Sequence, residues 1–400
     1  MQITFLIIMG IERPSGRRYF AIARELVRRG HRVRILALHP DLPSCPQRRF
    51  VQDGVEIWYV GQMHARKAAS VPGRFGAIDL LRVLISATLG MIWGIICSPA
   101  DVYHLGKPQP VNGLAALLAV RLLRRQPFYV DCDDDEVYGN RLPAAWQRAV
   151  FGFWQWLLPR MAAGTTVNTR HLASILTDAG VAPLALVPNG VNPDDFLAPP
   201  AATLAALRTA LSLDGRPVVA YAGTLALQNH PVDLLIEAFV QVADALPTAA
   251  LLIIGGGEDL PLLCDLAVRR GLRDRVYFTG QLPYHAVPAY LALADLSVDP
   301  VRDDPVARAR SPLKLFESMA LGVPVITGDV GDRAELLDGG ASGVLVRPDD
   351  ATALAEAIRD LLHDLPRRQA LAAAGRERAR IYRWDRLAAR WATIYIRETP

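Results

Sequence analysis

Short apolar runs rich in β-branched residues alternate with longer stretches of helical periodicity along most of the chain. The first kind of pattern predicts β-strands and the second predicts amphipathic helices. Repeated strand–helix–strand order is typical of a doubly wound parallel sheet. In the first 190 residues the expected strands are 3–9, 32–38, 55–60, 102–104, 128–131, 165–168 and 185–187, and the expected helices are 16–29, 78–97, 111–125, 143–161 and 169–179.

The alternation stops between residues 188 and 217, where five prolines surround a short alanine-rich segment, and restarts at Val218. We therefore expect α/β domains at 1–190 and 191–382, with a helix at about 383–400 packing back on the first domain. Ligands of such sheets bind at the carboxyl ends of the strands, so we expect the site in a cleft between two facing domains. The expected strands are 218–222, 250–254, 276–279, 296–299, 323–327 and 344–346, and the expected helices are 231–245, 259–270, 285–293, 312–321, 332–338 and 351–362.

Composition narrows the class of protein. A chain of 400 residues, 51% hydrophobic and 21% charged, is typical of a globular enzyme and excludes disorder and coiled coils. Its four cysteines are widely spaced, which predicts reduced core thiols and a cytoplasmic location. The longest uncharged apolar run, 83–97, is 15 residues long, whereas a membrane-spanning helix needs about 20. We therefore expect neither a spanning helix nor a signal peptide.

Charge is distributed unevenly. Residues 1–190 hold 22 Lys+Arg and 13 Asp+Glu, a net +9, whereas residues 191–400 hold 22 and 27, a net −5. No nucleic-acid module is recognisable, so the basic half favours peripheral contact with the inner face of a membrane. The alternative is that the apolar helix around Trp93 and the aromatic helix around Trp154 are simply buried in the domain.

Residues 307–327 contain the most informative motif. Ser311 and Pro312 predict the start of a helix, and Gly322 predicts its end. A helix N-terminus near Arg308 and Arg310 would attract a diphosphate. Lys314 and Glu317 then lie on one helical face, where a cation for phosphate and a carboxylate for ribose hydroxyls suit a nucleotide sugar. The alternative is a capped surface helix with an ion pair.

Several segments occur together in an order and spacing that resemble the retaining family 4 glycosyltransferases. This resemblance covers nearly the whole chain and implies the GT-B fold, with the donor bound mainly by the C-terminal domain and the acceptor by the N-terminal one. It also implies transfer of a sugar from a nucleotide diphosphate with retention at the anomeric carbon. The segments are VPNGVN (187–192), LIIGGG (252–257), DRVYFTG (274–280), ADL (294–296), SPLKLFESMALGVP (311–324), GDRAE (331–335) and GVLVRPD (343–349).

The resemblance assigns donor contacts but also reveals departures from the family pattern. Glu317 matches the family glutamate that holds the donor ribose, whereas Ala309 replaces the family's other glutamate. Thr224 replaces a family arginine, and His230 lies near the position of a family lysine that binds the diphosphate. Neutralising the phosphates then falls on Lys314, Arg308 or Arg310. Leu282 matches a position whose backbone often meets the base.

In the first half, Gly16 lies where the family brings a glycine-rich loop against the donor phosphates. A family histidine placed beside the donor sugar falls on Gly106, so His104 or Lys107 is the expected substitute. The alternatives are an ordinary strand-to-helix turn at Gly16 and a histidine hydrogen-bonded at a strand end at His104.

An acidic run at 131–136 invites a metal interpretation, because clustered carboxylates bind hard divalent cations. The family resemblance implies metal-independent chemistry instead, so we expect Asp133 and Asp134 to contact acceptor hydroxyls, with no metal site and no cofactor. The alternative is a solvated acidic loop.

The predicted function is transfer of a sugar from a nucleotide diphosphate sugar to a hydroxyl of a glycan, glycolipid or small-molecule acceptor. Departing diphosphate charge would be stabilised mainly by electrostatics. The alternatives are a non-catalytic sugar-nucleotide-binding subunit, favoured by Ala309 and Thr224, and a nucleotide-sugar epimerase on the same fold.

Overall fold

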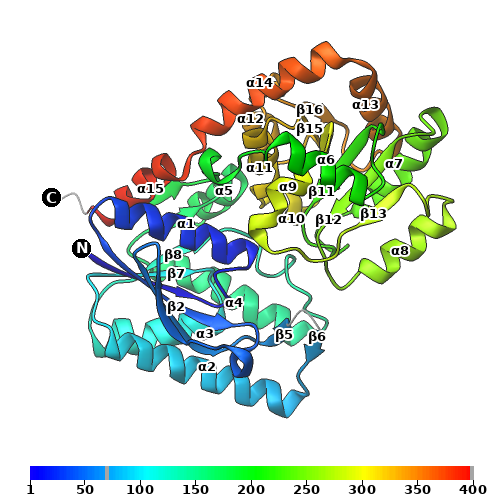
Figure 1. Cartoon of the computed structure of the whole chain (residues 1–400). Coiled ribbons are helices and arrows are strands. Elements are labelled where there is room, and N and C mark those ends of the chain that lie inside the picture. Colours follow the sequence, from blue (N-terminus) through cyan, green and yellow to red (C-terminus); the bar gives the residue numbers. More distant parts are fainter. Residues whose placement is uncertain (68–71, 397–400) are drawn as a thin grey trace. The chain divides into compact units, whose positions relative to one another are not determined.

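A computed structural model of the chain describes residues 1–67 and 72–396. Contacts divide these residues into two compact units, labelled by element in Figure 1. The N-terminal unit comprises the residues up to Pro188 and those from Trp384 onward, and the C-terminal unit is Asn189–Arg383. The proline-rich segment 188–217, where the strand–helix alternation stops, is therefore almost entirely part of the C-terminal unit.

The N-terminal unit is built on a sheet of eight strands in its described part, in the order β10-β9-β8-β7-β1-β2-β4-β3. All neighbours pair in parallel except β3, which runs antiparallel to β4 at the edge. Its strands are β1 (Gln2–Ile7), β2 (Arg32–His39), β3 (Arg49–Gln52), β4 (Val55–Gln62), β7 (Val102–Gly106), β8 (Tyr129–Cys132), β9 (Thr165–Val167) and β10 (Leu184–Leu186). Strands β5 (Ala65–Lys67) and β6 (Pro72–Arg74) pair antiparallel in a separate two-stranded sheet.

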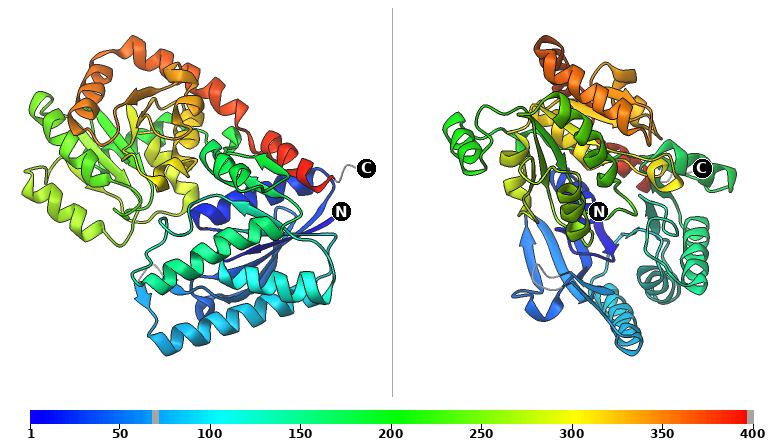
Figure 2. Two further views of the ribbon diagram at one scale, coloured as in Figure 1. Left: turned by 180° about the vertical axis from the view of Figure 1, so that it is seen from behind. Right: turned by 90° about the vertical axis from the view of Figure 1, so that its right-hand side faces the viewer.

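Helices cover this sheet on both faces. Helix α1 packs against α15, and α2 packs against β4 and α3, which in turn contacts α4. In Figure 2 the long α2 runs along the periphery of this unit. The helices are α1 (Pro14–Arg28), α2 (Ala77–Cys97), α3 (Pro110–Ala115), the π-helix η2 (Ala116–Leu123), α4 (Ala145–Met161), α5 (Arg170–Asp178) and α15 (Trp384–Ala392), with the 3-10 turns η1 (Leu42–Ser44) and η6 (Thr393–Tyr395).

The C-terminal unit has a six-stranded parallel sheet in the described residues, in the order β13-β12-β11-β14-β15-β16. Alternate side chains of β11 enter two separate apolar cores, Val219 and Tyr221 on one face and Val218 and Ala220 on the other. The strands are β11 (Val218–Ala222), β12 (Ala250–Ile254), β13 (Val276–Phe278), β14 (Leu296–Asp299), β15 (Val325–Gly328) and β16 (Val344–Val346).

Helices α7, α8 and α13 supply one of these cores, and α9 and α11 supply the other. The helices are α6 (Ala201–Ala210), α7 (Val232–Ala245), α8 (Leu260–Arg269), α9 (Val287–Leu291), α10 (Pro305–Arg308), α11 (Leu313–Leu321), α12 (Arg333–Leu336), α13 (Ala351–His363) and α14 (Leu365–Ile381), with the 3-10 turns η3 (Pro193–Asp195), η4 (Tyr284–Ala286) and η5 (Asp338–Gly340).

Some expected elements need correction. The helix expected at 111–125 begins as α3 but continues as the π-helix η2, and the helix expected at about 383–400 is shorter, because α15 ends at Ala392 and the turn η6 follows. Residues 397–400 of that expected helix lie outside the described residues. The expectation of no span-length helix is also wrong: 78–97 is long and apolar enough, with mean hydropathy 2.0, because Asp79 and Arg82 lie at one end. The core helices of soluble proteins also meet these criteria of length and composition.

Candidate functional site

Lys314 is the centre of a buried polar cluster in the C-terminal unit. Its Nζ lies 3.0 Å from Asp299 Oδ1 and donates to Tyr221 Oη at 3.2 Å, 4.4 Å from the centre of the Tyr221 ring. Tyr221 comes from β11, Asp299 ends β14 and Lys314 lies in the first turn of α11. The cluster therefore lies near the carboxyl ends of parallel strands, where ligands of α/β sheets bind.

A second cation shares the same carboxylate. Arg333, from the start of α12, donates to Asp299 Oδ2 from Nε and Nη2 at 3.3 and 3.2 Å, and its Nη1 donates to the Ala307 carbonyl. Burial, the largest single influence, would lower the pKa of Lys314, but the charges and hydrogen bonds of Asp299 and Tyr221 together raise it above its usual value. Burial would likewise raise the pKa of Asp299, yet its two cations hold it below the usual value. The triad carries one net positive charge.

His230 and Arg310 extend this positive region. Burial lowers the pKa of His230 well below its usual value, and Lys314, Arg310 and Arg333 lower it further, so the imidazole is neutral at pH 7. Arg310 Nη1 donates to the carbonyl of Asn229, the residue before His230. Arg308 instead pairs with the exposed Asp303 at 2.7 Å, outside this cluster.

The start of α11 differs from the expectation. The helix begins at Leu313 with Pro312 as its cap residue, and the Ser311 hydroxyl accepts from the Asn189 N–H at 2.9 Å. The predicted Ser311 cap is therefore wrong, because that oxygen is used by the segment that enters the unit. The predicted end is confirmed, since Gly322 adopts the left-handed conformation with φ 71°.

Glu317 lies one turn beyond Lys314 on α11 and is buried. Tyr284 in η4 donates its hydroxyl to Glu317 Oε1 at 2.8 Å. Leu282, two residues earlier, packs against the same core as α11, whereas Thr224 is exposed and its carbonyl accepts from Tyr221 Oη. The structure thus brings Lys314, Arg310 and His230 together and gives Glu317 a partner that sequence reasoning missed.

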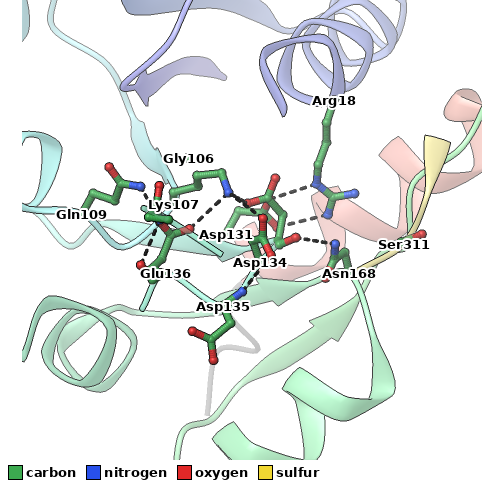
Figure 3. A network of polar contacts seen from close by, with 12 residues as sticks. Arg18, Gly106, Lys107, Gln109, Asp131, Asp134, Asp135, Glu136, Asn168 and Ser311 are labelled. Carbon is green, nitrogen blue, oxygen red and sulfur yellow. Dashed lines mark hydrogen bonds and ion pairs between the residues drawn. The ribbon is translucent and has the colours of Figure 1, made fainter. Parts of the chain in front are cut away.

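The N-terminal unit has its own buried ion pair, drawn in Figure 3. Arg18 from α1 makes two hydrogen bonds to Asp131 in β8, at 2.9 and 3.1 Å. Its remaining donors reach the carbonyls of Val187 and Pro188, and its guanidinium lies 5.2 Å from the Trp391 ring. Arg18 therefore contacts two segments of the N-terminal unit. One is the end of its first stretch of chain, at Val187 and Pro188, and the other is α15, which contains Trp391.

Lys107 lies beside this pair, after the end of β7, with its backbone at φ 72°. Its Nζ lies 3.0 Å from Asp133 Oδ1, 3.2 Å from Glu136 Oε1 and 3.7 Å from Asp134 Oδ2 (Figure 3). Burial would lower the pKa of Lys107, but these carboxylates raise it well above the usual value. The predicted residues Lys107, Asp133 and Asp134 are thus brought together, as an ion cluster rather than as a solvated loop.

His104 lies inside the same unit with no exposed surface. Its Nδ1 is 2.8 Å from Tyr395 Oη, and its ring lies 4.6 Å from that of Trp391. Burial lowers the pKa of this imidazole well below its usual value. This environment favours the alternative interpretation of His104 as a hydrogen-bonded histidine over contact with a substrate.

Gly106 and Gly16 both lie where a side chain would collide with neighbouring atoms. A Cβ at Gly106 would lie 2.6 Å from the Tyr19 ring, so the histidine that the family places there does not fit this chain. A Cβ at Gly16 would lie 2.0 Å from the Gly10 carbonyl oxygen, so a side chain there would open the loop before α1. The geometry at Gly16 therefore fits the turn interpretation. Within residues 1–67 and 72–396, no three His, Cys, Asp or Glu side chains are grouped to hold a metal ion.

Sequence reasoning missed Asp299, Tyr221, Arg333, Tyr284 and Arg18 as members of these clusters. Asp299 is the last residue of a predicted strand and Tyr221 the last but one of another. Polar residues at the carboxyl ends of parallel strands are candidates for a ligand site, and this position could have identified both. Arg333 and Arg18 are two among many arginines, so nothing local distinguishes them.

The chain folds into two Rossmann-like α/β units, each with a buried polar cluster at its strand ends, which confirms the predicted class of fold. Comparison with known families makes the assignment definite. Residues 15–190 match the glycosyl transferase 4-like domain, and residues 206–378 match the glycosyl transferases group 1. The chain belongs to this family of glycosyltransferases.

Individual relatives of the chain are also glycosyltransferases. Over 246 residues, 59% of this chain, it is 36% identical to a GDP-mannose-dependent alpha-(1-6)-phosphatidylinositol monomannoside mannosyltransferase of Mycobacterium tuberculosis, and the match spans 63% of that relative. It is 26% identical over 305 residues to the 2-deoxystreptamine glucosyltransferase of Streptomyces kanamyceticus, covering 75% of this chain and 72% of the relative. The chain thus matches under two thirds of the length of the first relative.

A solved structure supports the fold across the whole chain. Sucrose-phosphate synthase from Thermosynechococcus elongatus superposes with a TM-score of 0.76, covering 99% of this chain and 98% of its own, at 20% identity. At that identity the likeness concerns the fold alone.

Proposed function

We propose that this protein transfers a sugar from a nucleotide diphosphate sugar to an acceptor hydroxyl with retention of anomeric configuration. The observation that carries the proposal is the pairing of Lys314 and Glu317 one turn apart on α11, both buried and both fixed by partners from other elements. Membership of the family and the GDP-mannose-dependent relative support it. In this proposal the C-terminal unit binds the donor and the N-terminal unit the acceptor.

In this proposal the donor site stabilises the departing diphosphate with positive charge. The Lys314–Asp299–Arg333 triad has one net positive charge, and Arg310 adds another. Fixed positive charge of this kind stabilises a departing diphosphate without a metal ion. The acceptor oxygen would bond to the anomeric carbon as the carbon–diphosphate bond breaks, and the acceptor proton would pass to the diphosphate.

On the acceptor side we propose Asp133 and Asp134 as hydroxyl acceptors, with Lys107 holding them in place at 3.0 and 3.7 Å. The phosphatidylinositol mannoside and 2-deoxystreptamine relatives favour a glycolipid or a polyhydroxylated small molecule as acceptor.

The test of function is turnover. We expect release of nucleoside diphosphate from one or more of UDP-glucose, GDP-mannose and ADP-glucose when a hydroxyl acceptor, or water alone, is present. Ala309 and Thr224 motivate the alternative of a binding subunit. Binding without release from any of these donors would favour that alternative, and a product with altered sugar stereochemistry but no released nucleotide would indicate an epimerase.

We also propose that the enzyme is cytoplasmic and contacts a membrane surface peripherally, through a helical face of the N-terminal unit. Helix α2 exposes apolar side chains three or four residues apart, and η2 and α4 continue this apolar exposure. Helices α2 and α4 flank α3, so the three lie on one side of the sheet. The face comprises Ile78, Leu81, Ile85, Leu89, Trp93, Ile96, Leu114, Leu118, Leu122, Leu123, Trp146, Val150, Phe153 and Trp156.

Charge favours an anionic membrane over a second copy of the chain. Residues 77–97, 110–125 and 145–161 carry six arginines and one acidic residue, Asp79. Two copies meeting through this face would bring like charges together, whereas each arginine near an acidic leaflet adds about 1 kcal/mol. The opposite face of α2 packs on the sheet, where a Cβ at Gly90 would lie 2.1 Å from the Val60 carbonyl oxygen. We therefore propose that α2 lies along the membrane surface without crossing it.

Liposome flotation tests this proposal. We expect binding to vesicles with one third phosphatidylglycerol at low salt, and weaker binding at high salt or in pure phosphatidylcholine. Leu89→Ser and Trp156→Ser should weaken binding, whereas Leu262→Ser, at a leucine on α8 that is also at least half exposed, is the matched control. Trp154 is a poorer probe than its neighbours because its ring packs on Gly113. Equal flotation of all variants, or no binding to anionic vesicles, would refute the proposal.

A further inference from the structure

The Glu317 carboxylate is held by a phenol from another element of the C-terminal unit. Tyr284, in the turn η4 that follows β13, donates its hydroxyl to Glu317 Oε1 at 2.8 Å. Glu317 itself is only 7% exposed. A hydrogen bond to a buried carboxylate is among the stronger contacts in proteins, so this one fixes where the carboxylate points.

The phenol is itself held in place by packing. The Phe196 ring lies edge-on to that of Tyr284, with ring centres 5.7 Å apart and planes at 67°. Tyr284 also packs, partly buried, against the same apolar core as α11. The hydroxyl that contacts Glu317 is therefore positioned by the fold on one side and by the carboxylate on the other.

We infer that Tyr284 is a positioning residue that sets the enzyme's preference for ribose over deoxyribose donors. This inference rests on the proposed function, in which Glu317 accepts hydrogen bonds from the ribose hydroxyls. The terminal torsion of a glutamate is soft, with a broad distribution of angles. A hydrogen bond to one carboxylate oxygen of Glu317 fixes the orientation of the whole carboxylate. The 2′- and 3′-hydroxyls of a ribose can both donate to the carboxylate only when that orientation is fixed. A donor that lacks the 2′-hydroxyl gains less from the same orientation.

The test uses Tyr284→Phe in the full chain, which removes only the hydroxyl. We would measure dissociation constants for a nucleoside diphosphate and for its 2′-deoxy counterpart by calorimetry. We expect affinity for the ribonucleotide to fall on the order of 10-fold, as for loss of one hydrogen bond to a charged group. Affinity for the deoxynucleotide should change less than about 2-fold. The matched control is Tyr290→Phe, the same substitution on α9 in the same core.

The outcomes separate this inference from the function on which it rests. If Glu317→Ala leaves both affinities unchanged, the ribose assignment itself is wrong. If Glu317→Ala weakens ribonucleotide binding but Tyr284→Phe behaves like Tyr290→Phe, the role of Tyr284 is refuted. Equal weakening of both nucleotides in Tyr284→Phe would mean that the tyrosine supports the unit's structure only. A selective loss for the ribonucleotide, with an unchanged melting temperature, supports the inference.

Discussion

Replacing Lys314 by methionine should separate donor binding from folding. Methionine retains an unbranched apolar chain and removes the charge and the three donors of the ammonium group. The substitution changes the net charge of the Lys314–Asp299–Arg333 triad from +1 to zero. Donor phosphates would then lose their principal buried cation.

The stability of the chain should change little, because Asp299 keeps its ion pair with Arg333 at 3.2 Å. No carboxylate is left unpaired, so the severe penalty of an isolated buried charge does not apply. We expect the free energy of unfolding to fall by no more than about 2 kcal/mol. Loss of one charge-assisted hydrogen bond to phosphate should weaken nucleoside diphosphate binding by about 1.5–3 kcal/mol, or roughly 10- to 150-fold.

Calorimetric titration with UDP, GDP and ADP measures the binding change, and urea unfolding measures stability. Arg308→Ala is the matched control, because Arg308 is exposed and pairs with Asp303 outside the triad. We expect that control to bind within about 2-fold of the unaltered protein, as for loss of an exposed pair. Unchanged affinity in Lys314→Met, or an equal loss in both variants, would refute the reasoning.

Three further predictions concern stability and metal dependence. Asp299→Asn leaves two buried cations without a counter-charge, so urea unfolding should show a loss of about 3–5 kcal/mol, against less than about 1 kcal/mol for the exposed Asp303→Asn. The pKa of His104 is well below its usual value in the folded chain, so only the unfolded chain takes up this proton as pH falls below about 6.5. Stability should therefore fall with pH there by up to about 1.4 kcal/mol per unit from this group, and a slope unchanged in His104→Gln would contradict the assignment. Transfer activity should survive EDTA, and its complete loss with recovery on adding Mg²⁺ would restore the acidic run at 131–136 as a metal site.

Much of the fold was predictable because each element carries its own signal. Strands such as 218–222 and 250–254 are continuous apolar runs, as buried parallel strands must be, and both occur where expected. The edge strand β3 was missed because four largely exposed residues leave no alternation to detect. The π-helix η2 was missed because its apolar pattern does not differ visibly from that of an α-helix.

The site was predictable only in part. Lys314 and Glu317 lie within one local motif, so their common face follows from helical spacing. Asp299, Arg333 and Tyr284 reach them from distant positions in the sequence, and only the tertiary fold brings those side chains within bonding distance. The prediction that Ser311 caps α11 was wrong for the same reason, because the Ser311 hydroxyl accepts a hydrogen bond from the N–H of Asn189, 122 residues earlier.

The central claim is that the donor nucleotide binds to the C-terminal unit around Lys314 and Glu317. Hydrogen–deuterium exchange of the full chain measures this directly, with and without a saturating amount of whichever of UDP-glucose, GDP-mannose and ADP-glucose raises the melting temperature most. We predict slower exchange in residues 221–230, 280–284 and 307–317, and loss of that protection in Glu317→Ala at the same donor concentration. Protection confined to residues 1–188, or an identical pattern in Glu317→Ala, would contradict the account.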